Sequence, residues 1–477
     1  VRSLEVFASE LNFHCEEYAS NKGKFPPIKR RQKRSLYVCT IEKANSLINS
    51  LIENKRLNDL GFVVVDELHM IGEGGTRGAT LETALTKLRF VSPTTQIIGM
   101  SATLSNVDEL KLFLGAEFYE EYFRPVKLEE YVKLNKNIYK VDRSAMDDEN
   151  QLKEDRSISV EYTKEQLKSD PDQLVALVSE TIPNDQCLVF CPTKKICENV
   201  AQLIISFMPS TLLNDNATQR QDLINNLFEM NDGFLCDVLK CTIPYGVAYH
   251  HSGLTNDERL LIEESFSNGI LTCLTCTSTL AAGVNLPAKR VIIRAPYVAD
   301  QFISVTQYKQ MAGRAGRTGQ SETGECIILA RDKDCVQLKN VLFAPQFACD
   351  SNLMKDSGYG IKQLLLSAIS LKMGSTFDEL LSLLNKTLLS IQSNRLNYNM
   401  GDILKTYLEY LIDKHIVSST VLPNETITYE IARLGKATCD GSIEIDLAEK
   451  LYKDLQKKFK MFEFIKSITF IIYFDTL

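Results

Sequence analysis

The stretch from Gly61 to Met70 constrains the fold of this chain more than any other. Its first residues are β-branched and apolar, as in a parallel strand that is buried on both faces. The run then stops at two adjacent acids, Asp66 and Glu67. Ligands of an open parallel sheet bind beyond the carboxyl ends of its strands. One carboxylate could hold the water shell of a Mg²⁺ ion while its neighbour deprotonates an attacking water. A strand followed by a solvated acidic turn is the alternative interpretation.

Short apolar runs alternate with amphipathic runs in two successive parts of the chain. The apolar runs of the first part lie at 36–40, 61–65 and 96–100. Those of the second part lie at 186–191, 247–250, 271–276, 290–294 and 325–329. This alternation predicts two parallel sheets with helices on their faces. We interpret the charged stretch between them, 123–170, as a linker with a surface insertion. Thr255 and Glu258 have the spacing of a capping box that begins a helix.

The last part of the chain, from about Asp356, has helical periodicity. Amphipathic helices are expected at 361–373, 375–392 and 402–415, and the second would begin at a capping box of Ser375 and Asp378. Residues 427–434 are expected to form a strand pair or wing that Gly435 closes, and 445–477 a further helix. Three helices and a wing form a small module that either binds DNA or serves as a structural wedge.

Composition limits the classes of protein to which the chain can belong. Its 44% hydrophobic and 24% charged residues are typical of a soluble globular protein, and no stretch has the length and apolarity of a membrane span. The 13 cysteines have no disulfide framework, and Cys273–Cys276 is expected to be a buried strand rather than a zinc site. The net charge is −7, so a nucleic-acid partner needs a local basic surface. Residues 22–34 are the clearest candidate, with a solvated loop as the alternative.

Three further motifs follow expected strands. Ser101 and Thr103 end the strand at 96–100, where their hydroxyl groups could hydrogen-bond to the acidic motif. The stretch Thr277–Pro287 offers hydroxyl and backbone N–H groups that suit phosphate. Arg314 and Arg317 lie three residues apart on one helical face, so both could point into a cleft and clamp phosphate oxygens, as an arginine finger does.

These motifs resemble motifs II, III, V and VI of the superfamily-two helicases, in the same order: Asp66–His69, Ser101–Thr103, Thr277–Pro287 and Gln310–Arg317. Further segments resemble the Ski2-like DNA helicases within that superfamily: 39–45, 123–126, 188–195 and 249–254. Among these the chain is most similar to the helicase Q family, with the helicase domains of the DNA polymerase theta family next. The resemblance covers nearly the whole chain.

The resemblance implies a fold of two RecA-like parallel-sheet domains followed by an all-α winged-helix domain. The expected RecA-like domains are residues 1–128, which lack a first strand and a phosphate loop, and residues 129–333. The expected winged helix is 345–438, and 439–477 would begin a helical ratchet domain. Residues 295–306 lie where this group carries a strand-separating hairpin.

The resemblance also implies roles for individual residues. Asp66 would hold Mg²⁺, and Glu67 would activate the water that attacks ATP. Residues that couple hydrolysis to domain motion would be His69, Ser101 and Thr103. Residues that approach the nucleotide on its ribose side would be Gly283 and Asn285. Residues that contact the γ-phosphate would be Gln310, Arg314 and Arg317, with Arg317 facing Glu67 across a cleft. Residues near the phosphates of the nucleic acid would be Thr40, Lys43 and Thr277.

The implied function is an ATP-dependent DNA helicase core that uses ATP and Mg²⁺. It would move 3′-to-5′ on single-stranded DNA and unwind forked DNA during repair in the nucleus. An RNA helicase of the same group and a nucleic-acid-binding fragment without turnover are the alternatives. The phosphate cradle G-x-x-x-x-G-K-[ST] does not occur, because Phe25 follows Gly23 and Lys24, and Ala437 follows Gly435 and Lys436. We interpret the chain as a fragment of a longer helicase, truncated at both ends, and expect it to be inactive alone.

Overall fold

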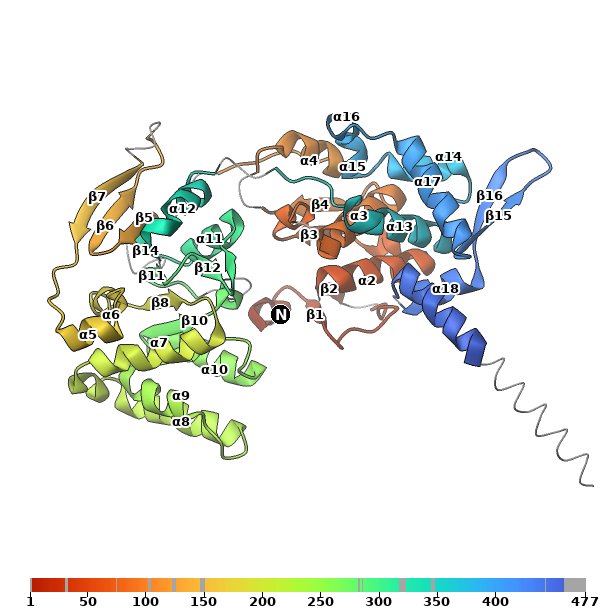
Figure 1. Ribbon diagram of the computed structural model, residues 1–477. Coiled ribbons are helices and arrows are strands. Elements are labelled where there is room, and N and C mark those ends of the chain that lie inside the picture. Colours follow the sequence, from red (N-terminus) through yellow and green to blue (C-terminus); the bar gives the residue numbers. More distant parts are fainter. Residues whose placement is uncertain are drawn as a thin grey trace, which may run out of the picture. The chain divides into compact units, whose positions relative to one another are not determined.

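The computed structural model divides into two compact units (Figure 1). The first unit joins Val1–Glu120 to Gln346–Leu477, and the second is Glu121–Pro345. The structure describes residues 2–30, 33–73, 75–101, 104–121, 126–145, 151–281, 284, 286–316, 323–344, 348–441 and 443–458. None of the helices within these ranges has the length and apolarity needed to cross a membrane. The domain boundaries expected at 128, 333 and 438 stay predictions.

The second unit is built on an eight-stranded sheet in the order β7-β6-β5-β14-β11-β8-β10-β9. Its six parallel strands are β5 (Lys127–Leu134), β14 (Thr323–Ala330), β11 (Arg290–Ile293), β8 (Cys187–Phe190), β10 (Cys273–Cys276) and β9 (Val247–His250). Every residue of β8, β9, β10 and β11 is buried, as expected of strands covered on both faces. The expected strands of this part are therefore confirmed, including the strand at Cys273–Cys276.

The interpretation of 123–170 as a linker with a surface insertion was wrong. This segment adds β5 to the parallel sheet and continues it with two antiparallel strands, β6 (Asn137–Val141) and β7 (Leu152–Ser157). Charged side chains are interspersed here with buried apolar ones such as Tyr131 and Val132. β7 is the edge strand of the sheet, and charge on an edge strand is a common device against edge-to-edge aggregation, so a low apolar content does not exclude a strand.

Helices and one short hairpin complete the second unit. The helices are α5 (Lys164–Ser169), α6 (Leu174–Ser179), α7 (Lys194–Phe207), α8 (Ala217–Met230), α9 (Asp237–Thr242), α10 (Asn256–Ser267), α11 (Val305–Ala312) and α12 (Cys335–Leu342). The hairpin pairs β12 (Tyr297–Val298) with β13 (Gln301–Phe302), within the expected hairpin segment. The capping box of α10 is confirmed: the Thr255 hydroxyl accepts from the Glu258 backbone N–H at 3.2 Å, and the Glu258 carboxylate accepts from the Thr255 N–H at 2.7 Å.

The first part of the first unit contains two pairs of parallel strands. One pair is β1 (Phe13–Tyr18) with β2 (Arg34–Cys39), and the other is β3 (Phe62–Val65) with β4 (Gln96–Gly99). The helices are α1 (Arg2–Ala8), α2 (Ile41–Glu53), α3 (Gly75–Val91) and α4 (Val107–Leu114). The strands expected at 36–40, 61–65 and 96–100 are confirmed. Basic residues between β1 and β2 form ion pairs with acids, among them Lys22–Glu17 and Arg30–Glu16, so residues 22–34 are not a purely cationic surface.

The C-terminal part of the first unit is helical with one two-stranded hairpin. Its helices are α13 (Lys355–Ser370), α14 (Phe377–Leu384), α15 (Leu388–Ile391), α16 (Ser393–Leu396), α17 (Met400–Asp413) and α18 (Arg433–Gly441), with residues 445–458 also helical. The hairpin pairs β15 (Val417–Val421) with β16 (Ile427–Ile431) in antiparallel orientation. A single core joins Ala79 of α3 to Leu364 and Leu365 of α13 and Leu404 of α17.

Three details of this part differ from the expectation. The helix at 375–392 is split into α14 and α15, and its capping box is Thr376 with Glu379, one residue later than Ser375 with Asp378. The wing takes its first strand from Val417–Val421, upstream of the expected 427–434. Gly435 does not close the wing but lies inside α18, where a Cβ would come within 2.1 Å of the Ile416 carbonyl oxygen.

Candidate active site

Asp66 and Glu67 directly follow β3 and are both exposed. The Glu67 backbone N–H donates to Asp66 Oδ1 at 2.9 Å, which leaves the second carboxylate oxygen of Asp66 for another partner. Glu67 has φ 52° and ψ 48°, in the left-handed region that non-glycine residues seldom occupy. This sharp turn at the carboxyl end of a strand is a frequent feature of functional sites, and it directs two adjacent carboxylates to the ligand edge of the sheet.

His69 connects the acidic motif to the end of the neighbouring strand. Its imidazole is 2% exposed, and its Nδ1 lies 3.3 Å from a Glu67 carboxylate oxygen and 3.4 Å from the Ser101 hydroxyl. The backbone aligns these groups, because Met100 N–H donates to the Val65 carbonyl and Leu68 N–H to the Met100 carbonyl, both at 2.8 Å. The structure therefore brings Glu67, His69 and Ser101 together, as the sequence predicted.

Thr40 and Lys43 lie together at the start of α2. The Thr40 hydroxyl caps this helix by accepting from the Lys43 backbone N–H at 3.4 Å. The Lys43 ammonium group lies 5.6 Å from the centre of the Phe25 ring, a cation–π contact. A half-buried Thr and Lys at a helix N-terminus that follows a strand present a hydroxyl and a positive charge suitable for phosphate.

In the second unit, one arginine joins the two motifs expected at the nucleotide. The Arg314 guanidinium donates to the Ala281 carbonyl, which lies in the Thr277–Pro287 stretch. The backbones also pair, since Ala288 N–H donates to the Arg314 carbonyl at 3.0 Å and Gly316 N–H to the Ala288 carbonyl at 2.7 Å. Thr277, at the end of β10, is 9% exposed and its hydroxyl lies 2.8 Å from that of Thr279. Gln310 is half-buried on α11.

Gly316 and Gly324 allow the backbone after Arg314 to lie directly against β14. A Cβ at Gly324 would come within 2.3 Å of the Gly316 nitrogen, and Gly316 itself has φ +101°. Any side chain at either position would push the arginine motif away from the sheet.

Sequence reasoning missed a polar network that holds α11 in place. The Tyr308 hydroxyl donates to Glu130 of β5 at 2.8 Å, and Arg143 contacts the same carboxylate with two nitrogens, each at 2.7 Å. Burial raises the pKa of Tyr308 well above its usual value, and Glu130 raises that of Arg143. The network was missed because residues 123–170 were interpreted as a linker, so β5 was not expected to be part of the sheet.

Four predicted site residues lie outside the described residues: Thr103, Gly283, Asn285 and Arg317. Their roles stay predictions, as does the facing of Glu67 and Arg317.

The exposed carboxylates fit the hard, oxygen-rich coordination that Mg²⁺ prefers. Within the described ranges, no group of three or more His, Cys, Asp or Glu side chains could enclose a metal ion. Mg²⁺ in nucleotide sites commonly takes only one or two protein carboxylates, with water and phosphate oxygens as its other ligands. Asp66, with one oxygen outside its backbone hydrogen bond, suits that arrangement.

Comparison with known protein families finds three matches along the chain. The DEAD/DEAH box helicase family matches residues 3–110, the helicase conserved C-terminal domain matches 217–319, and a helix-turn-helix domain matches 324–418. The parallel sheets are therefore those of two RecA-like helicase domains, and the helical part with its hairpin is the winged helix. The expected fold class is confirmed.

Individual relatives agree with these matches. Helicase POLQ-like of Homo sapiens is 48% identical over the whole chain, which covers 43% of that protein. The protein of the same name from Drosophila melanogaster is 39% identical over 96% of the chain and 46% of its own length. ATP-dependent DNA helicase Hel308 of Methanocella arvoryzae is 31% identical over 79% of the chain and 49% of its own length.

The chain thus spans about half the length, or somewhat less, of the curated relatives that it matches. Asp66, Ser101 and Thr277 lie at the carboxyl ends of parallel strands, and the family matches and relatives extend along nearly the whole sequence. On these grounds the chain belongs to the Ski2-like superfamily-two helicases.

Proposed function

We propose that this chain is the core of an ATP-dependent DNA helicase that uses Mg²⁺. The observation that carries the proposal is the cluster of Glu67, His69 and Ser101 beside Asp66, at the ends of the neighbouring strands β3 and β4. A carboxylate and a metal-binding neighbour at a strand end are what water activation for phosphoryl transfer requires.

Each residue of the cluster has a distinct role in this proposal. Bound Mg²⁺ neutralises charge on the phosphates, and Asp66 would hold it. Glu67 orients a water molecule and accepts its proton. His69 is buried between Glu67 and Ser101, so a shift of either motif changes its hydrogen bonds. Rearrangement at Glu67 can in this way reach β4 and the segment that follows it.

Residues of the second unit would complete the nucleotide site. Arg314 is fixed by its bond to the Ala281 carbonyl, and Gln310 lies one helical turn before it on α11. A guanidinium held by the backbone loses little conformational freedom when it contacts the γ-phosphate. We assign the same contact to Arg317, and the ribose side of the nucleotide to Gly283 and Asn285.

The nucleic acid would be single-stranded and forked DNA, unwound with 3′-to-5′ polarity in the nucleus. Thr40, Lys43 and Thr277 would contact its phosphates. The β12–β13 hairpin follows β11 directly and is short enough to act as a wedge at the fork. The DNA preference draws on two relatives whose names specify DNA, the DNA helicase Hel308 and DNA polymerase theta. An RNA helicase would instead unwind a matched RNA duplex faster than the DNA duplex.

The test is the Glu67→Gln substitution in a longer form of the protein that includes a phosphate cradle. We expect the variant to bind ATP and Mg²⁺ normally while DNA-stimulated hydrolysis falls by about a hundredfold or more, since the amide cannot accept the proton of the water. Glu10→Gln, at an exposed position of the same unit, is the matched control. Turnover near that of the wild type in Glu67→Gln would refute the assignment of the base.

A further inference from the structure

The second unit contains a pocket that the helicase motifs do not use. Its volume is about 530 Å³, within the range of small-molecule sites. It lies at the carboxyl ends of β14, β11 and β8, which are neighbours in the parallel sheet. This edge is where open α/β sheets bind ligands. None of the residues expected to contact ATP lines the pocket, and only the first residues of the hairpin segment reach it.

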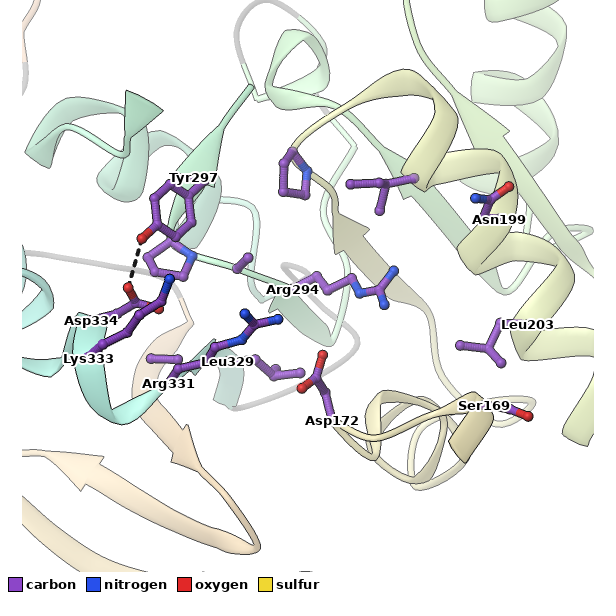
Figure 2. A pocket seen from close by; sticks show the side chains of 15 residues that line it. Ser169, Asp172, Asn199, Leu203, Arg294, Tyr297, Leu329, Arg331, Lys333 and Asp334 are labelled. Carbon is purple, nitrogen blue, oxygen red and sulfur yellow. Dashed lines mark hydrogen bonds between the residues drawn. The ribbon is translucent and has the colours of Figure 1, made fainter. Parts of the chain in front are cut away.

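Three cations from two strand ends face this pocket. Arg294 follows β11, and Arg331 and Lys333 follow β14. Figure 2 shows the Arg294 side chain extending from the end of β11 across the pocket toward Asn199. Among the described residues, none of these three cationic groups hydrogen-bonds to or pairs with a carboxylate, whereas Arg143, Arg156 and Arg290 of the second unit do.

The acids of the pocket only partly balance this charge. Asp172 and Asp334 line it, so three cations and two carboxylates leave a formal charge of +1, in a chain whose net charge is −7. The Asp334 carboxylate is already engaged, because it accepts from the Tyr297 hydroxyl at 2.7 Å (Figure 2). The pocket is therefore locally electropositive, and Asp172 provides a second carboxylate that can accept a hydrogen bond.

The opposite wall is apolar and regular. Ile196, Asn199 and Leu203 lie at positions i, i+3 and i+7 of α7, so one face of this helix lines the pocket. Leu329 of β14 and Pro192 after β8 add further apolar surface. A ligand that fits must have an anionic end for the guanidinium groups and a less polar body for the face of α7.

We propose that this pocket binds a small organic phosphate of the size of a nucleoside monophosphate. Arg294 and Arg331 take the phosphate, because planar guanidinium groups bind its oxygens with two parallel hydrogen bonds. The body of the ligand lies on Ile196 and Leu203, and Asp172 accepts a hydrogen bond from it. The ligand is either a free nucleotide or the phosphorylated end of a nucleic-acid strand. The proposal is independent of the hydrolysis assigned to Glu67.

The test is equilibrium binding of fluorescently labelled AMP to the chain in the absence of Mg²⁺. We expect saturable binding that Arg294→Gln and Arg331→Gln each weaken by about tenfold or more, as loss of a charge-assisted hydrogen bond does. Lys240→Gln removes an exposed cation of α9 outside the pocket and should leave binding unchanged. Arg294 and Arg331 lie outside the site proposed for ATP, so loss of binding in their variants separates the two sites.

Competition identifies the source of the phosphate. An oligonucleotide with a terminal phosphate that displaces AMP, while its hydroxyl-ended counterpart does not, indicates a strand end. Displacement by neither oligonucleotide indicates a free nucleotide. Arg331 is exposed, so its variant tests the site even where Arg294→Gln disturbs folding. No saturable binding, or equal binding by the arginine variants, would overturn the proposal.

Discussion

At the scale of single residues, Glu82 is the buried acid whose titration links pH to the stability of the first unit. It lies on α3 with no exposed surface. Its carboxylate accepts from the Ser351 hydroxyl at 2.7 Å and from the Leu389 N–H at 3.1 Å. Burial raises its pKa from 4.5 to about 7, against the opposing effect of these hydrogen bonds. Glu82 therefore joins the first helicase domain to the winged helix. Because its pKa is higher in the folded chain, folding favours the protonated form of this carboxyl group.

The sign of the pH dependence follows from this raised pKa. Between pH 4.5 and about 7 the folded chain binds more protons at Glu82 than the unfolded chain. Its contribution is thus fully present below pH 4.5 and is lost as pH rises toward 7, a change of about 3 kcal/mol. We expect Glu82→Gln, which keeps an acceptor for Leu389, to remove this part of the dependence in urea unfolding at pH 5 and pH 8. An unchanged pH dependence would contradict the buried titration, and Glu10→Gln is the exposed control.

At the scale of elements, two overlapping capping boxes are possible at the start of α14: Thr376 with Glu379, which the structure shows, and Ser375 with Asp378, which was expected from sequence. The Thr376 hydroxyl accepts from the Glu379 N–H at 3.3 Å, and the Glu379 carboxylate accepts from the N–H groups of Thr376 and Ser375 at 3.1 and 2.7 Å. Thr376→Ala should therefore lower the free energy of unfolding by about 1 kcal/mol. Asp378→Ala should cost only a few tenths of a kcal/mol. Urea unfolding of both variants checks this, and a larger loss in Asp378→Ala would favour the box expected from sequence.

The elements that sequence predicted well are those whose signal is local. Strands such as Cys273–Cys276 are continuous apolar runs because both faces of the sheet are covered, and the α10 box has one unambiguous spacing. β5 to β7 were missed because charged residues are interspersed with apolar ones along all three strands, so none forms a continuous apolar run. The Tyr308–Glu130–Arg143 network and the pocket at Arg294 join residues distant in sequence, and only the strand order brings them together.

The motif residues fall between these two cases. Glu67, His69 and Ser101 could be grouped from sequence because two neighbouring parallel strands end at the same edge. The contact between Arg314 and Ala281 could not, because it depends on how the backbone at Gly316 packs against Gly324.

At the scale of the whole molecule, binding of single-stranded DNA should depend on local rather than net charge. With a net charge of −7, long-range attraction is weak, and contacts such as that proposed for Lys43 must supply the affinity. Each phosphate contact releases counterions, so affinity should fall steeply as salt rises, with little dependence on base sequence. Fluorescence anisotropy with labelled oligonucleotides at several salt concentrations measures this. A flat salt dependence or a strong preference for one sequence would indicate a different kind of nucleic-acid module.

The last prediction concerns what residues 1–477 can do by themselves. No G-x-x-x-x-G-K-[ST] motif occurs among them. They therefore lack the phosphate loop whose backbone N–H groups, lysine and hydroxyl bind the β- and γ-phosphates. The β3–β4 pair also has apolar side chains exposed on one face, where Phe62 is 56%, Val64 48% and Ile98 42% exposed. Parallel strands are normally covered on both faces, so this face suits a covering helix.

A segment that brings a phosphate cradle and covers Phe62, Val64 and Ile98 would therefore both bury this face and complete the site. We expect residues 1–477 alone to show no DNA-stimulated ATP hydrolysis and to have poor solubility, and a form extended by such a segment to gain both activity and solubility. ATPase assays with single-stranded DNA compare residues 1–477 with the extended form. Glu67→Gln in the extended form gives the background activity that does not come from this site. Robust turnover by residues 1–477 would mean that the phosphates of ATP are held by groups other than a phosphate cradle, and that the nucleotide site does not depend on one.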